Sequence, residues 1–248
     1  MKMHLPSLAL SLAQSLALSL ACTVTLAQTI KGVTETSTYS RIENGKPAGP
    51  ANEIVEATLK RAGLDYNLAI YPWARAYDIA LQEPNVLIYL IARTPEREPH
   101  FKWVGEFIRV EYFLYKLREQ PGITLRSLEE AKAYTVGVMR NDVRHQFLQG
   151  KGFTKLVVSP QIGDNFRQLA NGQVQLAALS EPGAAQLCEE ARFDCTRLEK
   201  AYALDELSVG IWMAYSKPTS DEVVARTRAA FDKIKASGTV ARLMAAKR

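Results

Sequence analysis

The feature that most constrains this fold is an uncharged apolar run, VLIYLI, at residues 86–91. A run of this length suits a strand that is buried on both faces, as in sheets covered by helices on both sides. Pro95 fixes φ and lacks a backbone N–H, so the strand must end before it. Residues 93–97 therefore follow the carboxyl end of a strand, which is where α/β domains bind ligands.

Strands and helices alternate on both sides of this run. The N-terminal part predicts a β-α-β-α-β order, with Asn52 as the cap and Gly63 as the end of the first helix. The predicted elements there are strands at 29–34, 66–70 and 86–91 and helices at 52–61 and 73–82. This order predicts an α/β layer domain with a mainly parallel sheet.

A second α/β unit of similar build follows a Pro-Gly turn at residues 121–122. It opens with a capping box, SLEE, at residues 127–130. Its predicted elements are strands at 134–138, 156–158 and 176–179 and helices at 142–149, 164–170 and after Pro182. Residues 107–117 and 207–215 are both strand-like and join the units, and helices from 220 and from 239 end the chain. Two crossings between two lobes make a hinge, and a cleft between lobes is a natural ligand site.

The first residues are typical of an export signal. A short basic head at residues 1–4 precedes an uncharged segment rich in Leu, Ala and Ser at residues 5–26, and small residues follow that suit cleavage after Ala27. A retained membrane anchor is the alternative, but the Ser and Gln content makes the segment only modestly apolar. Lipidation at Cys22 is a further alternative. We expect a leader at 1–27, a discontinuous first lobe at 28–112 and 206–248, and a second lobe at 113–205.

Charge and cysteine content narrow the possible partners. The formal net charge is +5, and removal of the leader, whose only charged residue is Lys2, lowers it to +4. Lys and Arg are dispersed without a basic run, so we expect no nucleic-acid partner. Cys188 and Cys195 lie close together in an exported chain, which favours a disulfide. Neither His100 nor His145 has metal-ligand spacing with them, so we expect no metal and no cofactor.

Several motifs, in order, resemble the extracellular solute-binding protein family 3, the type II periplasmic binding proteins of polar amino acid ABC transporters. The resemblance covers nearly all of the predicted mature chain. It rests on NGKP at 44–47, TPER at 94–97 with Phe101 and Trp103, SLEE at 127–130 before VGV at 136–138, and LANGQV at 169–174. It implies a two-lobe α/β fold, each lobe a mainly parallel sheet flanked by helices, and two hinge strands.

The resemblance also implies binding roles for particular residues. The Arg of the TPER motif, Arg97, corresponds to the residue that clamps a ligand carboxylate, and its planar fork of donors suits that role. Trp73 corresponds to an aromatic residue that flanks the ligand. The remaining ligand-binding candidates are Arg75 at the start of a cleft-facing helix, Glu35 and Tyr39 after the first strand, Arg140 and Asn141 at a helix start, and Ser180 at a strand end.

Two positions depart from the family pattern. Ala92 stands where the family has Ser or Thr, and Ser180 stands where it has an Asp that accepts the α-ammonium. A desolvated ammonium needs an acceptor. Either Glu35 or Glu181 takes that role, or the ligand is a carboxylate or polar solute without an ammonium.

The sequence thus predicts a periplasmic, monomeric binding protein for a small polar solute, with an ABC permease of the inner membrane as partner. Two alternatives remain open. One is an enzyme on the same fold, dehydratase-like and acting on a small carboxylate, although the sequence has no recognised catalytic motif. The other is a sensor-type binding protein.

Overall fold

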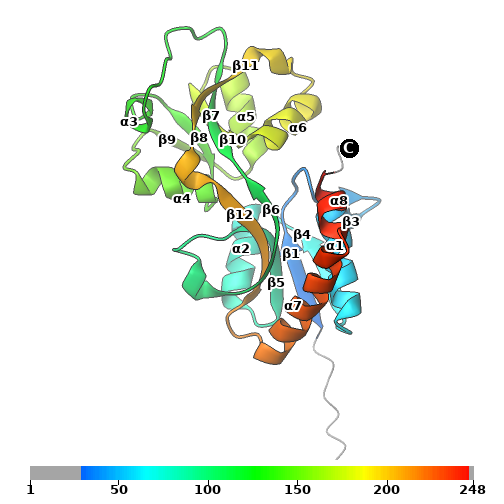
Figure 1. Ribbon diagram of the computed structural model, residues 1–248. Helices are drawn as coiled ribbons and strands as arrows, with labels where there is room; N and C mark the ends of the chain where they lie inside the picture. The colour runs from blue at the N-terminus through cyan, green and yellow to red at the C-terminus, as the bar shows by residue number, and fades with distance from the viewer. Residues whose placement is uncertain (1–28, 246–248) are drawn as a thin grey trace, which may run out of the picture.

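The chain folds into two lobes, each built on one five-stranded sheet with helices on its faces (Figure 1). The computed structural model describes residues 29–245, so the predicted leader, its cleavage site and Cys22 lie outside the described residues. The first sheet has the strand order β4-β1-β5-β12-β6, and the second has the order β11-β7-β10-β8-β9.

The first lobe combines the N-terminal segment with the C-terminal helices. Its sheet contains β1 (Ile30–Thr34), β4 (Tyr66–Ile70), β5 (Val86–Ala92), β6 (Phe101–Val110) and β12 (Val209–Ser216). A small hairpin, β2 (Arg41–Glu43) with β3 (Lys46–Ala48), precedes the first helix. The helices are α1 (Pro50–Arg61), α2 (Trp73–Gln82), α7 (Asp221–Ala236) and α8 (Thr239–Ala245), with a short η1 (Glu98–His100). The C-terminal helices pack on α1 and β6.

The second lobe is continuous in sequence. Its strands are β7 (Tyr112–Leu117), β8 (Val136–Met139), β9 (Leu156–Ser159), β10 (Leu176–Ser180) and β11 (Leu198–Ala203). Its helices are α3 (Leu128–Ala131), α4 (Val143–Gly150), α5 (Ile162–Ala170) and α6 (Glu181–Ala191), with η2 (Cys195–Arg197) before β11.

Both sheets are mixed, where the sequence predicted mainly parallel sheets. In the first, β1 is parallel to β4 and β5, whereas β12 is antiparallel to β5 and β6. In the second, β8 is parallel to β9 and β10, whereas β7 is antiparallel to β10 and β11. The parallel pairs come from the predicted βαβ units. The antiparallel pairs involve β6, β7, β11 and β12, the strands next to the two crossings.

The first of the two crossings divides a strand that the sequence presented as continuous. Residues 107–117 were predicted as one long strand, but β6 ends at Val110 in the first sheet and β7 begins at Tyr112 in the second. The return crossing runs from β11 through η3 (Asp205–Leu207) to β12 (Figure 1). Only these two connections link the lobes within residues 29–245, which permits hinge motion between them.

The central strand β5 contains a bulge beside the site. Its residues from Val86 to Tyr89, with Ile91, are fully buried, as the apolar run predicted. The pairing with β12 shifts between Tyr89 and Ile91, and the extra residue, Leu90, has a φ of 62°. A positive φ is unfavourable for Leu, and bulges of this kind re-aim side chains near functional sites. Leu90 lines the cavity described below.

Local capping signals agree with the structure except at α1. Ser127 accepts a hydrogen bond from the Glu130 N–H, as the capping box predicted, and Ser220 caps α7 in the same way. The first helix instead begins at Pro50 after Gly49, so Asn52 is not its cap. Buried Asn52 donates to the Tyr89 hydroxyl, with 2.9 Å between Nδ2 and Oη. The Asn52 side chain, which the sequence assigned to helix capping, is therefore bonded to the buried Tyr89 hydroxyl on β5 instead.

A disulfide joins Cys188 in α6 to Cys195 in η2, which confirms the sequence prediction. The Cα atoms of the two residues are 5.5 Å apart, within the ordinary range for disulfides. The bond closes a short loop between the end of α6 and the start of β11. A loop of this length stabilises the fold by about 2–3 kcal/mol through the unfolded chain.

Candidate functional site

A cavity of about 470 Å³ lies between the lobes and takes its lining from both. Glu35, Tyr39, Tyr71, Trp73 and Arg97 of the first lobe line it, as do Tyr112, Asp142, Arg144, Gln161 and Ser180 of the second. A volume of this order is typical of small-molecule sites.

The cavity sits at the carboxyl ends of the parallel strands of both sheets. Glu35 directly follows β1, and Trp73 comes shortly after β4. Arg97 follows β5, Asp142 follows β8, and Ser180 ends β10. Since each short loop after a parallel strand emerges at the same edge of its sheet, chain segments far apart in sequence meet there.

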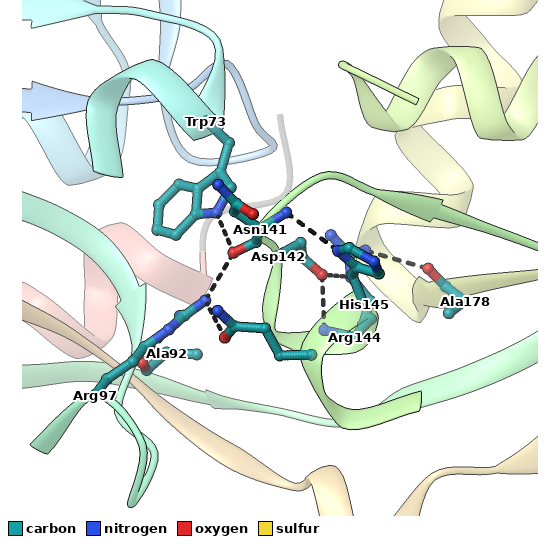
Figure 2. Close-up of polar contacts among 9 residues, drawn as sticks. Trp73, Ala92, Arg97, Asn141, Asp142, Arg144, His145 and Ala178 are labelled. Atoms are coloured by element: carbon teal, nitrogen blue, oxygen red, sulfur yellow. Dashed lines mark hydrogen bonds and ion pairs between the residues drawn. The ribbon is translucent and has the colours of Figure 1, made fainter. Parts of the chain in front are cut away.

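Arg97 is almost fully enclosed, with 1% of its surface exposed. Its Nη1 donates to the Ala92 carbonyl oxygen over 3.2 Å, and its Nη2 donates to the Asn141 carbonyl and to Gln146 Oε1, each over 3.1 Å (Figure 2). Its guanidinium also lies 5.4 Å from the Trp73 ring centre and 5.1 Å from that of Tyr77. Burial lowers the pKa of Arg97, a shift that the Asp142 carboxylate opposes.

Trp73 reaches across the cleft to the same backbone carbonyl. Its Nε1 donates to the Asn141 oxygen over 2.9 Å, beside the Arg97 bond (Figure 2). Asn141 has a φ of 58°, and its N–H is 3.3 Å from His145 Nδ1. Three hydrogen bonds from the first lobe therefore end on Asn141 and Gln146 of the second lobe.

Asp142 and Arg144 form a buried ion pair at the start of α4. One Asp142 oxygen accepts from the Arg144 N–H over 2.9 Å, and so caps the helix, and it also accepts from Arg144 Nε. Arg144 Nη1 lies 3.3 Å from the Ala178 carbonyl oxygen, and its guanidinium lies 5.2 Å from the Tyr112 ring centre. Burial alone raises the pKa of Asp142, but Arg144 outweighs that effect and holds the pKa below its usual value.

Glu35 faces these charges from the first lobe. It is half-buried, and part of its surface lines the cavity. Burial, reinforced by repulsion from Asp142, raises the pKa of Glu35 from 4.5 to about 8, although Arg144 and Arg97 oppose the shift. Glu35 is therefore mostly protonated at neutral pH.

The structure brings together some of the predicted site residues and leaves others outside. Glu35, Tyr39, Trp73, Arg97 and Ser180 line the cavity, and Asn141 contributes its backbone carbonyl beside it. The Ser180 hydroxyl accepts from the Gly183 N–H and caps α6. By contrast, Arg75 is exposed and stacks on Tyr71, 4.8 Å from its ring centre, and Arg140 is exposed; neither lines the cavity.

Sequence reasoning missed the most charged part of the site. The sequence places Asp142 only in the turn at a helix start that favours an anion, and it does not single out Arg144, Gln146 or Tyr112. A usable signal existed, because Asp followed two residues later by Arg at a helix start places both side chains at one helix end. By contrast, no local signal in the sequence indicates that Tyr112 is the first residue of β7, directly after the first crossing, where it lines the cavity.

Residues 29–245 contain no group of three or more His, Cys, Asp or Glu side chains arranged to hold a metal ion. They also contain no helix with the length and apolar character needed to cross a membrane.

Comparison with solved structures identifies the fold. The chain is similar to a histidine kinase sensor domain with similarity to periplasmic binding proteins, with a TM-score of 0.76, 20% identity, and 88% of this chain and 93% of that chain covered. It is also similar to ArtJ, the arginine-, lysine-, histidine-binding protein of Geobacillus stearothermophilus, with a TM-score of 0.74, 16% identity, and 88% and 94% covered.

A third similar structure is AbpA, an amino acid ABC transporter substrate-binding protein from Streptococcus pneumoniae, bound to L-arginine. Its TM-score is 0.72 at 17% identity, with 87% of this chain and 92% of that chain covered. No protein-family model and no curated protein matches the chain. At these identities the likeness is one of fold, and the fold is the two-lobe periplasmic-binding-protein type, as the sequence predicted.

Proposed function

We propose that this chain is the solute-binding component of an ABC-type uptake system. It captures a small polar solute, an amino acid or related carboxylate, between two closing lobes. The observation that carries this proposal is the cavity between the lobes. Its lining combines Glu35 and Arg97 of one lobe with Asp142 and Arg144 of the other. A site of this kind suits a polar solute better than an apolar one.

Binding drives closure through a population shift. A solute that touches Glu35 and Trp73 on one side and Arg144 and Ser180 on the other makes its full set of contacts only when the lobes are closed. Those additional contacts favour the closed form over the open one. The hinge is formed by the crossings at residues 110–112 and 204–208, and we propose lobe boundaries near them, at 112/113 and 205/206.

The proposal includes a location and a partner. Export through the predicted leader, cleaved near Ala27, delivers the protein to the periplasm. There the closed monomer docks on a permease of the inner membrane. ArtJ is an arginine-, lysine-, histidine-binding protein, and AbpA is a substrate-binding protein of an amino acid ABC transporter. Their similarity to this chain supports this choice among the functions that the fold can host.

A thermal stability screen tests the proposal. Purified protein is heated with each of the twenty amino acids, small organic acids, an uncharged sugar and putrescine. A true ligand at about 100 times its dissociation constant adds about 2.7 kcal/mol, or roughly 5–10 °C for a chain of this size. If native mass spectrometry finds no co-purified solute and no compound in the screen shifts the melting temperature, the transport proposal fails.

Sensing is the second candidate, since one similar structure is the sensor domain of a histidine kinase. The same screen identifies its ligand, and capture of either a permease or a kinase from membranes separates the two roles. The enzyme alternative predicts that a bound carboxylate is chemically changed. Mass spectrometry of the solute after incubation with the protein tests that alternative.

A further inference from the structure

The two buried arginines of the cavity differ in how their donors are used. Arg97 donates through both terminal nitrogens to acceptors of the protein, and two of its three bonds cross to the second lobe. Its Nε is buried without a partner, and only 1% of the Arg97 surface is exposed. In this arrangement Arg97 ties the lobes together, and a side chain this fully enclosed presents almost no surface to a solute.

Arg144 has the opposite arrangement. Its Nε binds Asp142 and its Nη1 reaches the Ala178 carbonyl oxygen, while within residues 29–245 no acceptor is bonded to Nη2. The side chain lines the cavity, and the Tyr112 ring supports its guanidinium. These three partners fix the guanidinium plane, so little side-chain entropy is lost when a further acceptor binds.

The charged side chains that line the cavity also favour binding of an anion. Two guanidiniums, Arg97 and Arg144, face one carboxylate, Asp142, and a Glu35 carboxyl that burial keeps mostly protonated at neutral pH. These four side chains therefore carry a net charge of +1. A single solute carboxylate beside Arg144 balances that charge without requiring Glu35 to ionise.

We propose that Arg144, and not Arg97, is the residue that binds the carboxylate of the solute, and that Arg97 with Trp73 acts as a latch between the lobes. This inference rests on the proposed function, because it assigns the solute class of the same cavity. The solute is a carboxylate, gripped through the free Nη2 of Arg144. Asp142 is a positioning residue, since it orients Arg144 through Nε.

The test compares each acid with its amide, which lacks the negative charge. The probes are L-arginine with L-argininamide, L-glutamine with L-glutaminamide, and succinamate with succinamide. Affinities are measured by calorimetry at pH 7 for the wild type, Arg144→Gln and Arg144→Lys, with Arg97→Gln as the matched variant. The readout is the ratio of the amide to the acid dissociation constant. Effects on folding or lobe closure act on both members of a pair and cancel in this ratio.

We expect the wild type to prefer at least one acid by about tenfold or more, the size of a charge-assisted hydrogen bond. Arg144→Gln should reduce that preference to about one, and Arg97→Gln should weaken both members of the pair while keeping the preference. Arg144→Lys keeps the charge beside Asp142 but loses the planar fork, so it serves if Arg144→Gln does not fold. For Arg144→Lys, the logarithm of the ratio of the amide to the acid dissociation constant should be less than half of the wild-type value.

The inference is overturned if Arg97→Gln loses the preference while the Arg144 variants keep it. It is also overturned if the wild type prefers no acid over its amide, or binds only uncharged or cationic solutes; in that last case the binding function survives and only the solute class is wrong. Absence of binding by any compound, together with no co-purified solute, removes the proposed function itself.

Discussion

The raised pKa of Glu35 predicts that this one carboxyl makes the folded protein less stable as the pH rises. Its pKa is about 8 in the folded protein, against 4.5 for the unfolded chain, because of burial and repulsion from Asp142. The folded state thus holds a proton that the unfolded state has lost between these two values. The stabilisation is fully present below pH 4.5 and is lost as the pH rises through about 8.

The size of this effect follows from the difference between the two pKa values. Each pKa unit corresponds to about 1.4 kcal/mol, so the difference corresponds to about 5 kcal/mol as an upper limit. Part of the Glu35 surface lines the cavity, where water screens its charge. We therefore expect the pH-dependent contribution of Glu35 to the free energy of unfolding to be about 2 kcal/mol.

The perturbation is Glu35→Gln, which resembles the protonated carboxyl at every pH. The free energy of unfolding of the variant and the wild type is measured by denaturant titration from pH 4 to pH 9. We expect the two proteins to be similar near pH 4 and the variant to be more stable by about 2 kcal/mol at pH 9. Glu181→Gln is the control, because that side chain is exposed and paired with Lys200. Equal pH profiles for the wild type and Glu35→Gln would refute the reasoning.

Three further predictions concern other parts of the chain. Replacing Cys188 and Cys195 with serine should lower the free energy of unfolding by about 2–3 kcal/mol, measured by denaturant titration, and no loss would contradict the disulfide. Gly105→Ala should destabilise by about 1–3 kcal/mol, since its Cβ would lie 2.2 Å from the Phe231 ring; unchanged stability would mean that the ring moves away freely. Trp73→Phe keeps an aromatic side chain but removes the indole N–H that bonds across the cleft, so X-ray scattering should show a larger radius of gyration without solute; an unchanged radius would exclude that bond as a latch.

The sequence by itself determined the α/β class and the order of most elements. The apolar run at residues 86–91 became the buried β5, and the segments on either side alternated between strand and helix as predicted, because these patterns depend on local periodicity and turn residues. It also indicated the disulfide, because the two cysteines are close in sequence. Asn52 was misassigned, because capping propensity is local whereas its partner, the Tyr89 hydroxyl, is 37 residues away.

Only the tertiary structure decided which side chains meet in the cleft and how their donors are used. Arg97 follows β5 as predicted, but its partners Asn141 and Gln146 come from a lobe that the chain enters only after the hinge. The pKa of Glu35 likewise depends on Asp142, more than one hundred residues later in sequence. Hydrogen bonding and charge interaction depend on distance in space, and the hinge and the two sheets set that distance.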